Sequence, residues 1–169
     1  MNKKIPTMSR ISLLFVCLGN ICRSPTAHVV FESMVNAKGL ADRIHVDSAG
    51  TGDWHLGKAP DTRSSATALE RGYDMSNLKS RLVTSDDFLN FDYIIAMDSK
   101  NLADMHAMSP PNFEGIIRLM LDYSQSDRYL DVREVPDPYY GGEDGFPFVV
   151  DLIEDASKGL LDSIIAELD

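Results

Sequence analysis

One stretch near the N-terminus joins a short apolar run to the start of a helix through a loop that carries a cysteine and an arginine. Residues 11–16 are typical of a short buried strand, and Pro25 suits the first turn of a helix, where its missing N–H costs nothing. The loop from Cys17 to Ser24 should therefore bring several backbone N–H groups to one place. Amides at a helix N-terminus favour negative charge. The sequence predicts a cradle for an oxyanion with a thiol at its floor.

The residue types in this loop fit that chemistry. Thiols at helix N-termini beside a cation ionise readily, so we expect Cys17 to be a thiolate at neutral pH. The planar fork of Arg23 can hold two oxygens of a tetrahedral anion, which a lysine cannot do. Gly19 and Asn20 tolerate positive φ, and Ser24 is placed to donate to the Cys17 sulfur. The alternative, a buried thiol and a surface charge, does not explain why the two stand in a strand–loop–helix context.

The rest of the chain alternates short apolar runs with amphipathic stretches, which predicts a single α/β domain with a parallel sheet. We expect strands over residues 11–17, 44–48, 92–97 and 116–120, and helices over residues 25–39, 60–72, 84–90, 99–107 and 147–168. In parallel sheets ligands bind beyond the carboxyl ends of the strands. Cys17, Ser48 and Asp98 follow or end the first three strands, so one rim should collect them.

The last predicted helix has an apolar face at helical spacing, formed by Phe148, Leu152, Ile153, Ala156, Leu160, Ile164 and Leu168. Before it, residues 122–140 form the only long irregular connection that we expect, and long ordered loops are usually functional. There Asp137 stands between two prolines that restrict the backbone on both sides. It is a candidate general acid, although an Asp-Pro pair alone is more typical of a turn.

Three aromatic residues occur at predicted loop positions. Tyr139 and Tyr140 follow Asp137 directly, and Trp54 lies in the loop after the second strand. Such side chains can form the walls of a slot for a flat ring, or they can simply pack on the surface.

The composition limits the classes of partner. The chain has 169 residues, of which 44% are hydrophobic, and this suits one compact domain over residues 10–169. Its net charge of −10 disfavours binding to nucleic acid or an anionic membrane, so an anionic substrate must be attracted by a local positive field. Lys3 and Lys4 before residues 11–16 imitate a signal peptide, but the apolar run is short and its cleavage would remove Cys17. We expect a cytoplasmic protein with a flexible leader over residues 1–9.

The chain has two cysteines, Cys17 and Cys22, five positions apart. A structural disulfide that close would restrain almost nothing, and no histidine has ligand spacing around the pair, so we expect no metal site. Two alternatives remain open. Cys22 either resolves a sulfenic acid on Cys17 as a reversible disulfide, or it is a small buried hydrophobe.

These motifs together resemble the low-molecular-weight protein tyrosine phosphatases. The resemblance covers nearly the whole chain, through Val16-Cys17-Leu18-Gly19-Asn20-Ile21-Cys22-Arg23-Ser24-Pro25, Asp47-Ser48-Ala49-Gly50-Thr51, Ala96-Met97-Asp98 and Val135-Pro136-Asp137-Pro138-Tyr139-Tyr140. It implies a phosphatase-I, flavodoxin-like fold with strand order 2-1-3-4 and helices on both faces. It also implies hydrolysis of phosphotyrosine in proteins and peptides, and of small aryl phosphates, through a phosphocysteine on Cys17. No cofactor is implied.

The resemblance also assigns residue roles. Arg23 binds the phosphoryl group, and Asp137 acts first as acid and then as base. Asn20 and Ser48 brace the loop, and Asp98 supports the site. A histidine that the family often has is replaced by Leu78, which leaves part of the bracing network in question.

The resemblance also implies a set of substrate contacts. They are expected from the loop residues Leu18, Gly19, Asn20, Ile21, Cys22 and Ser24 and from Trp54, Tyr139 and Tyr140. In the family the two tyrosines can themselves be phosphorylated.

Three other functions fit less well. A nucleotide-binding P-loop requires a G-x4-G-K-[ST] motif that the chain lacks. Arsenate reductases on the same scaffold relay electrons through further cysteines, and here only Cys22 remains. A noncatalytic phosphate-binding module would be expected to have lost one of Cys17, Arg23 or Asp137, all of which are present.

Overall fold

A computed structural model describes residues 10–142 and 144–168. Within that part of the chain, four parallel strands form one sheet in the order β2-β1-β3-β4. The strands are β1 (Ile11–Cys17), β2 (Ile44–Gly50), β3 (Tyr93–Ala96) and β4 (Ile116–Leu119). The predicted parallel sheet and its order are confirmed. The proposed leader, residues 1–9, lies outside the described residues.

The helices follow the predicted sequence, with shifts at their ends. They are α1 (Arg23–Ala37), α2 (Thr62–Glu70), α3 (Asp87–Asn90), α4 (Ser99–Met108) and α5 (Gly145–Leu168). Helix α3 is shorter than the predicted 84–90 because the Asp87 carboxylate accepts a hydrogen bond from the Thr84 N–H and holds that segment in a turn. The connection predicted to be irregular contains short 3-10 helices: η2 (Met120–Tyr123), η3 (Asp127–Tyr129) and η4 (Pro138–Tyr140).

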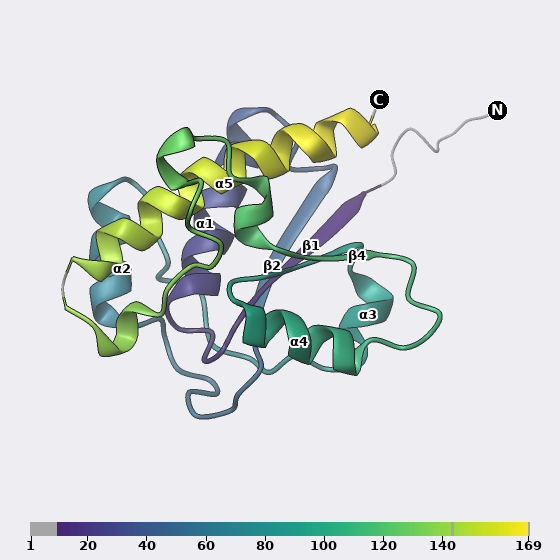
Figure 1. The fold of residues 1–169 in the computed structure, drawn as a ribbon, viewed down its shortest axis with the longest axis horizontal. Coiled ribbons are helices and arrows are strands. Elements are labelled where there is room, and N and C mark those ends of the chain that lie inside the picture. The colour runs from purple at the N-terminus through teal and green to yellow at the C-terminus, as the bar shows by residue number, and fades with distance from the viewer. Residues whose placement is uncertain (1–9, 143, 169) are drawn as a thin grey trace.

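The sheet is buried on both faces. Side chains alternate along a strand, so Leu13 and Phe15 pack with α1 and α5, whereas Leu14 and Val16 pack with α3 and α4. Figure 1 shows these two pairs of helices on opposite sides of the strands. Because both faces are covered, β1 needs a continuous apolar run rather than an alternating one. The prediction of helices on both faces is confirmed.

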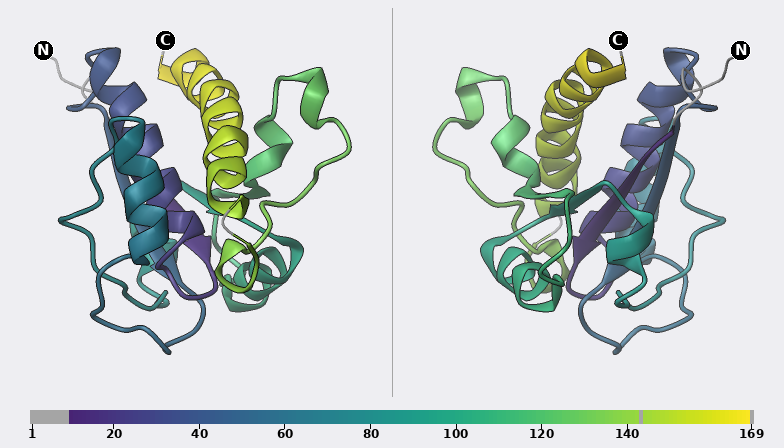
Figure 2. Two further views of the ribbon diagram at one scale, coloured as in Figure 1. Left: turned by 90° about the vertical axis from the view of Figure 1, so that its left-hand side faces the viewer. Right: turned by 90° about the vertical axis from the view of Figure 1, so that its right-hand side faces the viewer.

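Helix α5 runs alongside α1 and contributes much of the larger core (Figure 2). The predicted apolar face is confirmed for five residues, all fully buried: Leu152, Ile153, Ala156, Leu160 and Ile164. It is wrong for Phe148, which is 38% exposed and lies edge-on to the Tyr129 ring. Leu168 is partly buried. These two residues occupy the end turns of α5, where the helix extends past the centre of the sheet.

No helix among residues 10–142 and 144–168 is both long enough and apolar enough to cross a membrane.

Candidate active site

Residues 18–22, here called the anion loop, connect β1 to α1 at the carboxyl edge of the sheet. No backbone N–H of this loop has a hydrogen-bond acceptor within the described part of the chain. Asn20 has a φ of 56°, which curls the loop in a conformation that asparagine tolerates better than most residues. Several unpaired N–H groups at a helix N-terminus form an anion-binding concavity. The positive φ expected in this loop is found at Asn20 and not at Gly19.

The loop lies directly against the end of β2. A Cβ on Gly50 would come within 2.8 Å of the Leu18 carbonyl oxygen and 3.1 Å of the Asn20 nitrogen. Both contacts are with backbone, which cannot move aside as a flexible side chain would. Glycine at position 50 is therefore what allows β2 and the anion loop to approach.

The Cys17 sulfur lies at the base of the loop and is held by Ser24. Its Sγ is 3.0 Å from the Ser24 hydroxyl and accepts from the Ser24 N–H at 3.4 Å. Asn20 fixes the direction of the first contact, because its amide nitrogen donates to the Ser24 hydroxyl at 2.8 Å. The hydroxyl hydrogen then has two acceptors, the Cys17 sulfur and, at 3.4 Å, the Ala49 carbonyl. The shorter contact stabilises negative charge on sulfur.

The anion loop is braced from the segment that follows Leu78. The Ser80 hydroxyl donates to the Gly19 carbonyl at 2.9 Å, and the Arg81 N–H donates to the Asn20 side-chain oxygen at 3.0 Å. Arg81 itself is clamped between the carboxylates of Asp47 and Asp87. Leu78 packs on a small apolar cluster instead. Ser80 and Arg81 thus brace the loop although the family histidine is absent. Neither residue was predicted from the sequence to do so.

Arg23 is 3% exposed and lies between two acidic residues. Its Nη1 donates to Asp98 at 2.6 Å and to the Val135 carbonyl at 3.1 Å, and its Nη2 lies 3.6 Å from Asp137. Burial opposes the charge of Arg23, but the charges of Cys17, Asp98 and Asp137 outweigh it and raise the pKa of the guanidinium. Neither Nε nor Nη2 makes a hydrogen bond to another described residue. One edge of the fork is therefore available for a ligand.

Asp137 comes from the other end of the chain and caps η4. Its Oδ1 accepts from the Tyr139 N–H at 3.0 Å, and its Oδ2 is the oxygen nearest to Arg23. The carboxyl side chain is 31% exposed, so one oxygen is fixed while the other remains accessible. Asp137 thus precedes a turn of 3-10 helix that begins at Pro138.

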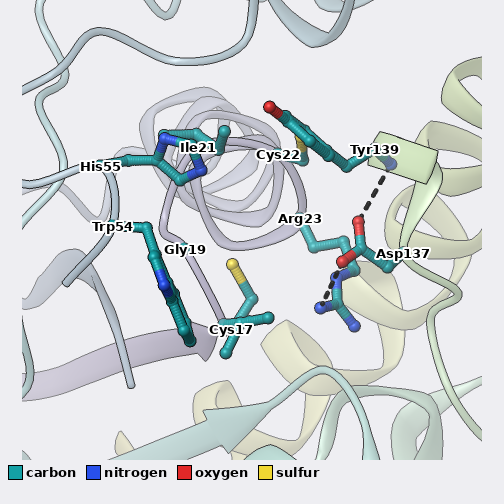
Figure 3. Close-up of a pocket in the computed structure, with 10 residues that line it drawn as sticks. Cys17, Gly19, Ile21, Cys22, Arg23, Trp54, His55, Asp137 and Tyr139 are labelled. Atoms are coloured by element: carbon teal, nitrogen blue, oxygen red, sulfur yellow. Dashed lines mark hydrogen bonds and ion pairs between the residues drawn. The ribbon is translucent and has the colours of Figure 1, made fainter. Parts of the chain in front are cut away.

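These side chains surround one cavity of about 250 Å³. Figure 3 shows the Cys17 sulfur between the Trp54 ring on one side and Arg23 and Asp137 on the other. Trp54 is 67% exposed, and the His55 ring lies against the Tyr139 ring with centroids 5.8 Å apart. Three aromatic rings, those of Trp54, His55 and Tyr139, therefore contribute to the walls. His55 was not predicted to line the site; its position next to Trp54 was the one available signal.

Cys22 also lines the cavity but is buried among Ile21 and Phe146. Burial is the main reason that the pKa of the Cys22 thiol is raised to about 12, with the nearby Asp61 adding to it. Cys22 is therefore protonated at neutral pH. Both cysteines are free thiols in this structure.

The predicted residues differ in their relation to the cavity. Those that line the cavity are Cys17, Leu18, Gly19, Ile21, Cys22, Arg23, Trp54, Asp137 and Tyr139. Ser24 and Asp98 do not line it but contact Cys17 and Arg23, which do, and Asn20 donates to Ser24. Ser48 does not brace the loop, because β2 continues past it to Gly50 and its hydroxyl is 3.1 Å from His28 on α1. The side chain of Tyr140 lies outside the described part of the structure.

Within residues 10–142 and 144–168, no group of three or more His, Cys, Asp or Glu side chains could hold a metal ion.

A parallel sheet of order 2-1-3-4 with a thiol, a buried arginine and unpaired amides at its carboxyl edge defines an α/β protein with a candidate oxyanion site. Residues 12–169 match the family model described as low molecular weight phosphotyrosine protein phosphatase. The chain belongs to this family and is a phosphatase of the low molecular weight type.

Characterised relatives agree with this assignment. The chain is 41% identical to the low molecular weight protein-tyrosine-phosphatase YfkJ of Bacillus subtilis, over 93% of this chain and 97% of that protein. It is 43% identical to the low molecular weight phosphotyrosine protein phosphatase of Schizosaccharomyces pombe, over 91% and 97%. A crystal structure of a protein tyrosine phosphatase from Entamoeba histolytica, with Hepes in its active site, superposes with a TM-score of 0.87 at 41% identity, over 93% and 98% of the two chains.

Proposed function

We propose that this protein hydrolyses phosphotyrosine in proteins or peptides through a phosphocysteine on Cys17. The observation that carries the proposal is the arrangement around the sulfur: unpaired N–H groups of the anion loop, the free edge of Arg23 and the carboxyl of Asp137 all border one cavity. A phosphoryl group bound to the loop amides and to Nε and Nη2 of Arg23 lies beside the nucleophile. The Ser24 hydroxyl stabilises the thiolate before attack.

In the first step the Cys17 thiolate attacks phosphorus and the bond to the phenolic oxygen breaks. Asp137 gives its proton to that oxygen, which makes a phenol rather than a phenolate the leaving group. In the second step water attacks the phosphocysteine, Asp137 takes the proton from the water, and inorganic phosphate and the thiolate are released. Arg23 keeps both contacts as the transferred group flattens, because its fork is planar.

The shape of the cavity supports an aryl substrate. Trp54, His55 and Tyr139 form walls that a phenyl ring can contact on its faces. A phosphoserine side chain is too short to reach Cys17 while its peptide stays outside these walls.

The test is a direct comparison of three reactions: hydrolysis of a phosphotyrosine peptide, hydrolysis of a phosphoserine peptide of the same flanking sequence, and reduction of arsenate with a thiol reductant. The proposal predicts turnover of the first substrate only. Preferred hydrolysis of phosphoserine, or arsenate reduction that depends on Cys22, would contradict it.

A further inference from the structure

Arg63, in the first turn of α2, does not line the cavity but contacts two segments that form it. Its Nε and Nη2 donate to the Asp61 carboxylate at 3.1 and 2.9 Å, and Nη2 also donates to the Tyr139 carbonyl at 3.3 Å. The side chain is 45% exposed. A surface ion pair adds little to stability. The ion pair with Asp61 therefore does not explain why Arg63 also contacts Tyr139 of η4.

Two aromatic rings hold the same guanidinium. Its Cζ lies 4.7 Å from the centroid of the Phe146 ring and 5.4 Å from that of the Tyr139 ring. These are cation–π distances, and a planar guanidinium can stack on rings while its edge donates to a carboxylate. Arg63 thereby joins η4 to the start of α5 and to α2.

Asp61 connects this arrangement to the anion loop. Its backbone N–H donates to the Ile21 carbonyl at 2.9 Å, and its carboxylate caps α2 by accepting from the N–H groups of Arg63 and Ser64. Burial opposes the charge of this carboxylate, but the hydrogen bonds from Arg63 and Ser64 outweigh it and lower the pKa of Asp61. Asp61 therefore stays ionised, and Arg63 is held at a fixed place relative to the loop.

Tyr139 connects Arg63 to Asp137, the proposed general acid. Arg63 holds the carbonyl of Tyr139, and the N–H of the same residue holds Oδ1 of Asp137 at 3.0 Å. A general acid must lie within hydrogen-bond reach of the departing oxygen, and misplacement by about 1 Å can cost on the order of 10²-fold in rate.

We propose that Arg63 is a positioning residue for Asp137: it fixes η4 relative to the anion loop, so that the carboxyl faces the departing oxygen. This inference rests on the proposed phosphatase mechanism, in which Asp137 is the general acid. Arg63 itself touches neither the phosphoryl group nor the sulfur.

The test measures kcat/KM for aryl phosphates that range from phenyl phosphate to strongly activated esters, because kcat/KM reports the step in which the leaving group departs. The variants are Arg63→Gln and Arg63→Lys. Arg71→Gln is the matched control, since Arg71 lies at the other end of α2 and pairs with Asp151 and Glu154 of α5. Thermal unfolding checks that each variant is folded.

For Arg63→Gln we expect a loss of roughly 10-fold or more with phenyl phosphate and less than about 3-fold with the most activated ester. Arg63→Lys should show the same pattern with a smaller loss, because an ammonium keeps the charge beside Asp61 but cannot also stack and donate to Tyr139. If Arg63→Gln does not fold, the leaving-group pattern of Arg63→Lys tests the proposal in its place. Arg71→Gln should leave the leaving-group dependence unchanged.

A double variant isolates the path through Asp137. If Arg63 acts through the acid, adding Arg63→Gln to Asp137→Asn costs no further activity with phenyl phosphate. An equal loss across all esters, no loss at all, or additive losses in the double variant would overturn the positioning role. If Asp137→Asn shows the leaving-group signature while the Arg63 variants do not, the proposed mechanism stands and only this inference fails. A wild-type protein inactive on every ester would overturn both.

Discussion

Oδ2 of Asp137 lies 3.6 Å from Nη2 of Arg23, although the two residues are more than a hundred positions apart in the chain. The other carboxylate oxygen accepts a hydrogen bond from the Tyr139 N–H, so in the proposed mechanism Oδ2 is the oxygen that faces the phosphoryl group. A guanidinium and a carboxyl group thus border the same cavity as Cys17.

Asp137→Asn should lower kcat/KM for phenyl phosphate by roughly 10²–10⁴-fold, the usual contribution of a general acid, with a much smaller loss for a strongly activated ester. The amide preserves the shape of the side chain but has no proton to give. Steady-state kinetics on both substrates measures the difference. If kcat/KM falls by the same factor for both substrates, Asp137 has a structural role and another group is the acid.

Arg23→Lys should weaken binding of inorganic phosphate or vanadate and slow turnover, because a point charge replaces a fork whose Nε and Nη2 are free for two oxygens. It also loses one of the two contacts that Nη1 makes with Asp98 and Val135. Calorimetric titration with phosphate, together with kinetics, measures both effects. Affinity and rate equal to the wild type would mean that the fork does not contact the anion.

Peroxide should inactivate the protein by oxidising Cys17 to a sulfenic acid. The Cys22 thiolate can then attack that sulfur, forming the S–S bond and breaking the S–O bond, so that hydroxide leaves. Because burial raises the pKa of Cys22 to about 12, little of it is thiolate at pH 7, and the capture rate should rise as the pH increases toward that value.

Intact-mass analysis after peroxide and then dithiothreitol checks this redox prediction. Wild type should pass through an intramolecular disulfide and recover its activity, whereas Cys22→Ser should gain oxygen and stay inactive. Equal recovery of the two proteins would favour the alternative that Cys22 only packs.

Gly159→Ala should lower the unfolding temperature, although alanine is normally the better helix former. A Cβ at this position of α5 would lie 2.0 Å from the Tyr123 carbonyl oxygen, so α5 and η2 must move apart. We expect a cost of about 1–3 kcal/mol, as for other overpacked sites. Lys158→Ala, at the exposed neighbouring position, is the control for helix propensity. An unchanged or higher unfolding temperature for Gly159→Ala would show that the contact relaxes freely.

The sequence was sufficient to predict the strands, the helices and the place of the anion loop between β1 and α1, because each depends on local pattern. The apolar run of β1 and the cysteine and arginine after it are adjacent in the chain. Asp137 was found because two prolines mark its turn. The boundaries of α3 were less accurate, since they depend on the Asp87 carboxylate bonding to Thr84.

What the sequence did not reveal are contacts between segments that no local pattern connects. Ser80 and Arg81 reach the anion loop only because Gly50 lets β2 lie against it. Arg63 likewise contacts a distant segment, since it donates to the carbonyl of Tyr139. The prediction that Ser48 braces the loop was wrong because β2 continues two residues past it. The Ser48 hydroxyl contacts His28 instead.

The central claim is that the phosphoryl group passes through Cys17. The most direct measurement is rapid quenching of Asp137→Asn with an activated aryl phosphate, followed by intact-mass and peptide analysis, because this variant lacks the base that hydrolyses the intermediate. We predict one added phosphoryl group, located on Cys17, and none in a Cys17→Ser protein that still binds phosphate. Phosphate release with no phosphoryl group on Cys17, or the group on another residue, would contradict the account.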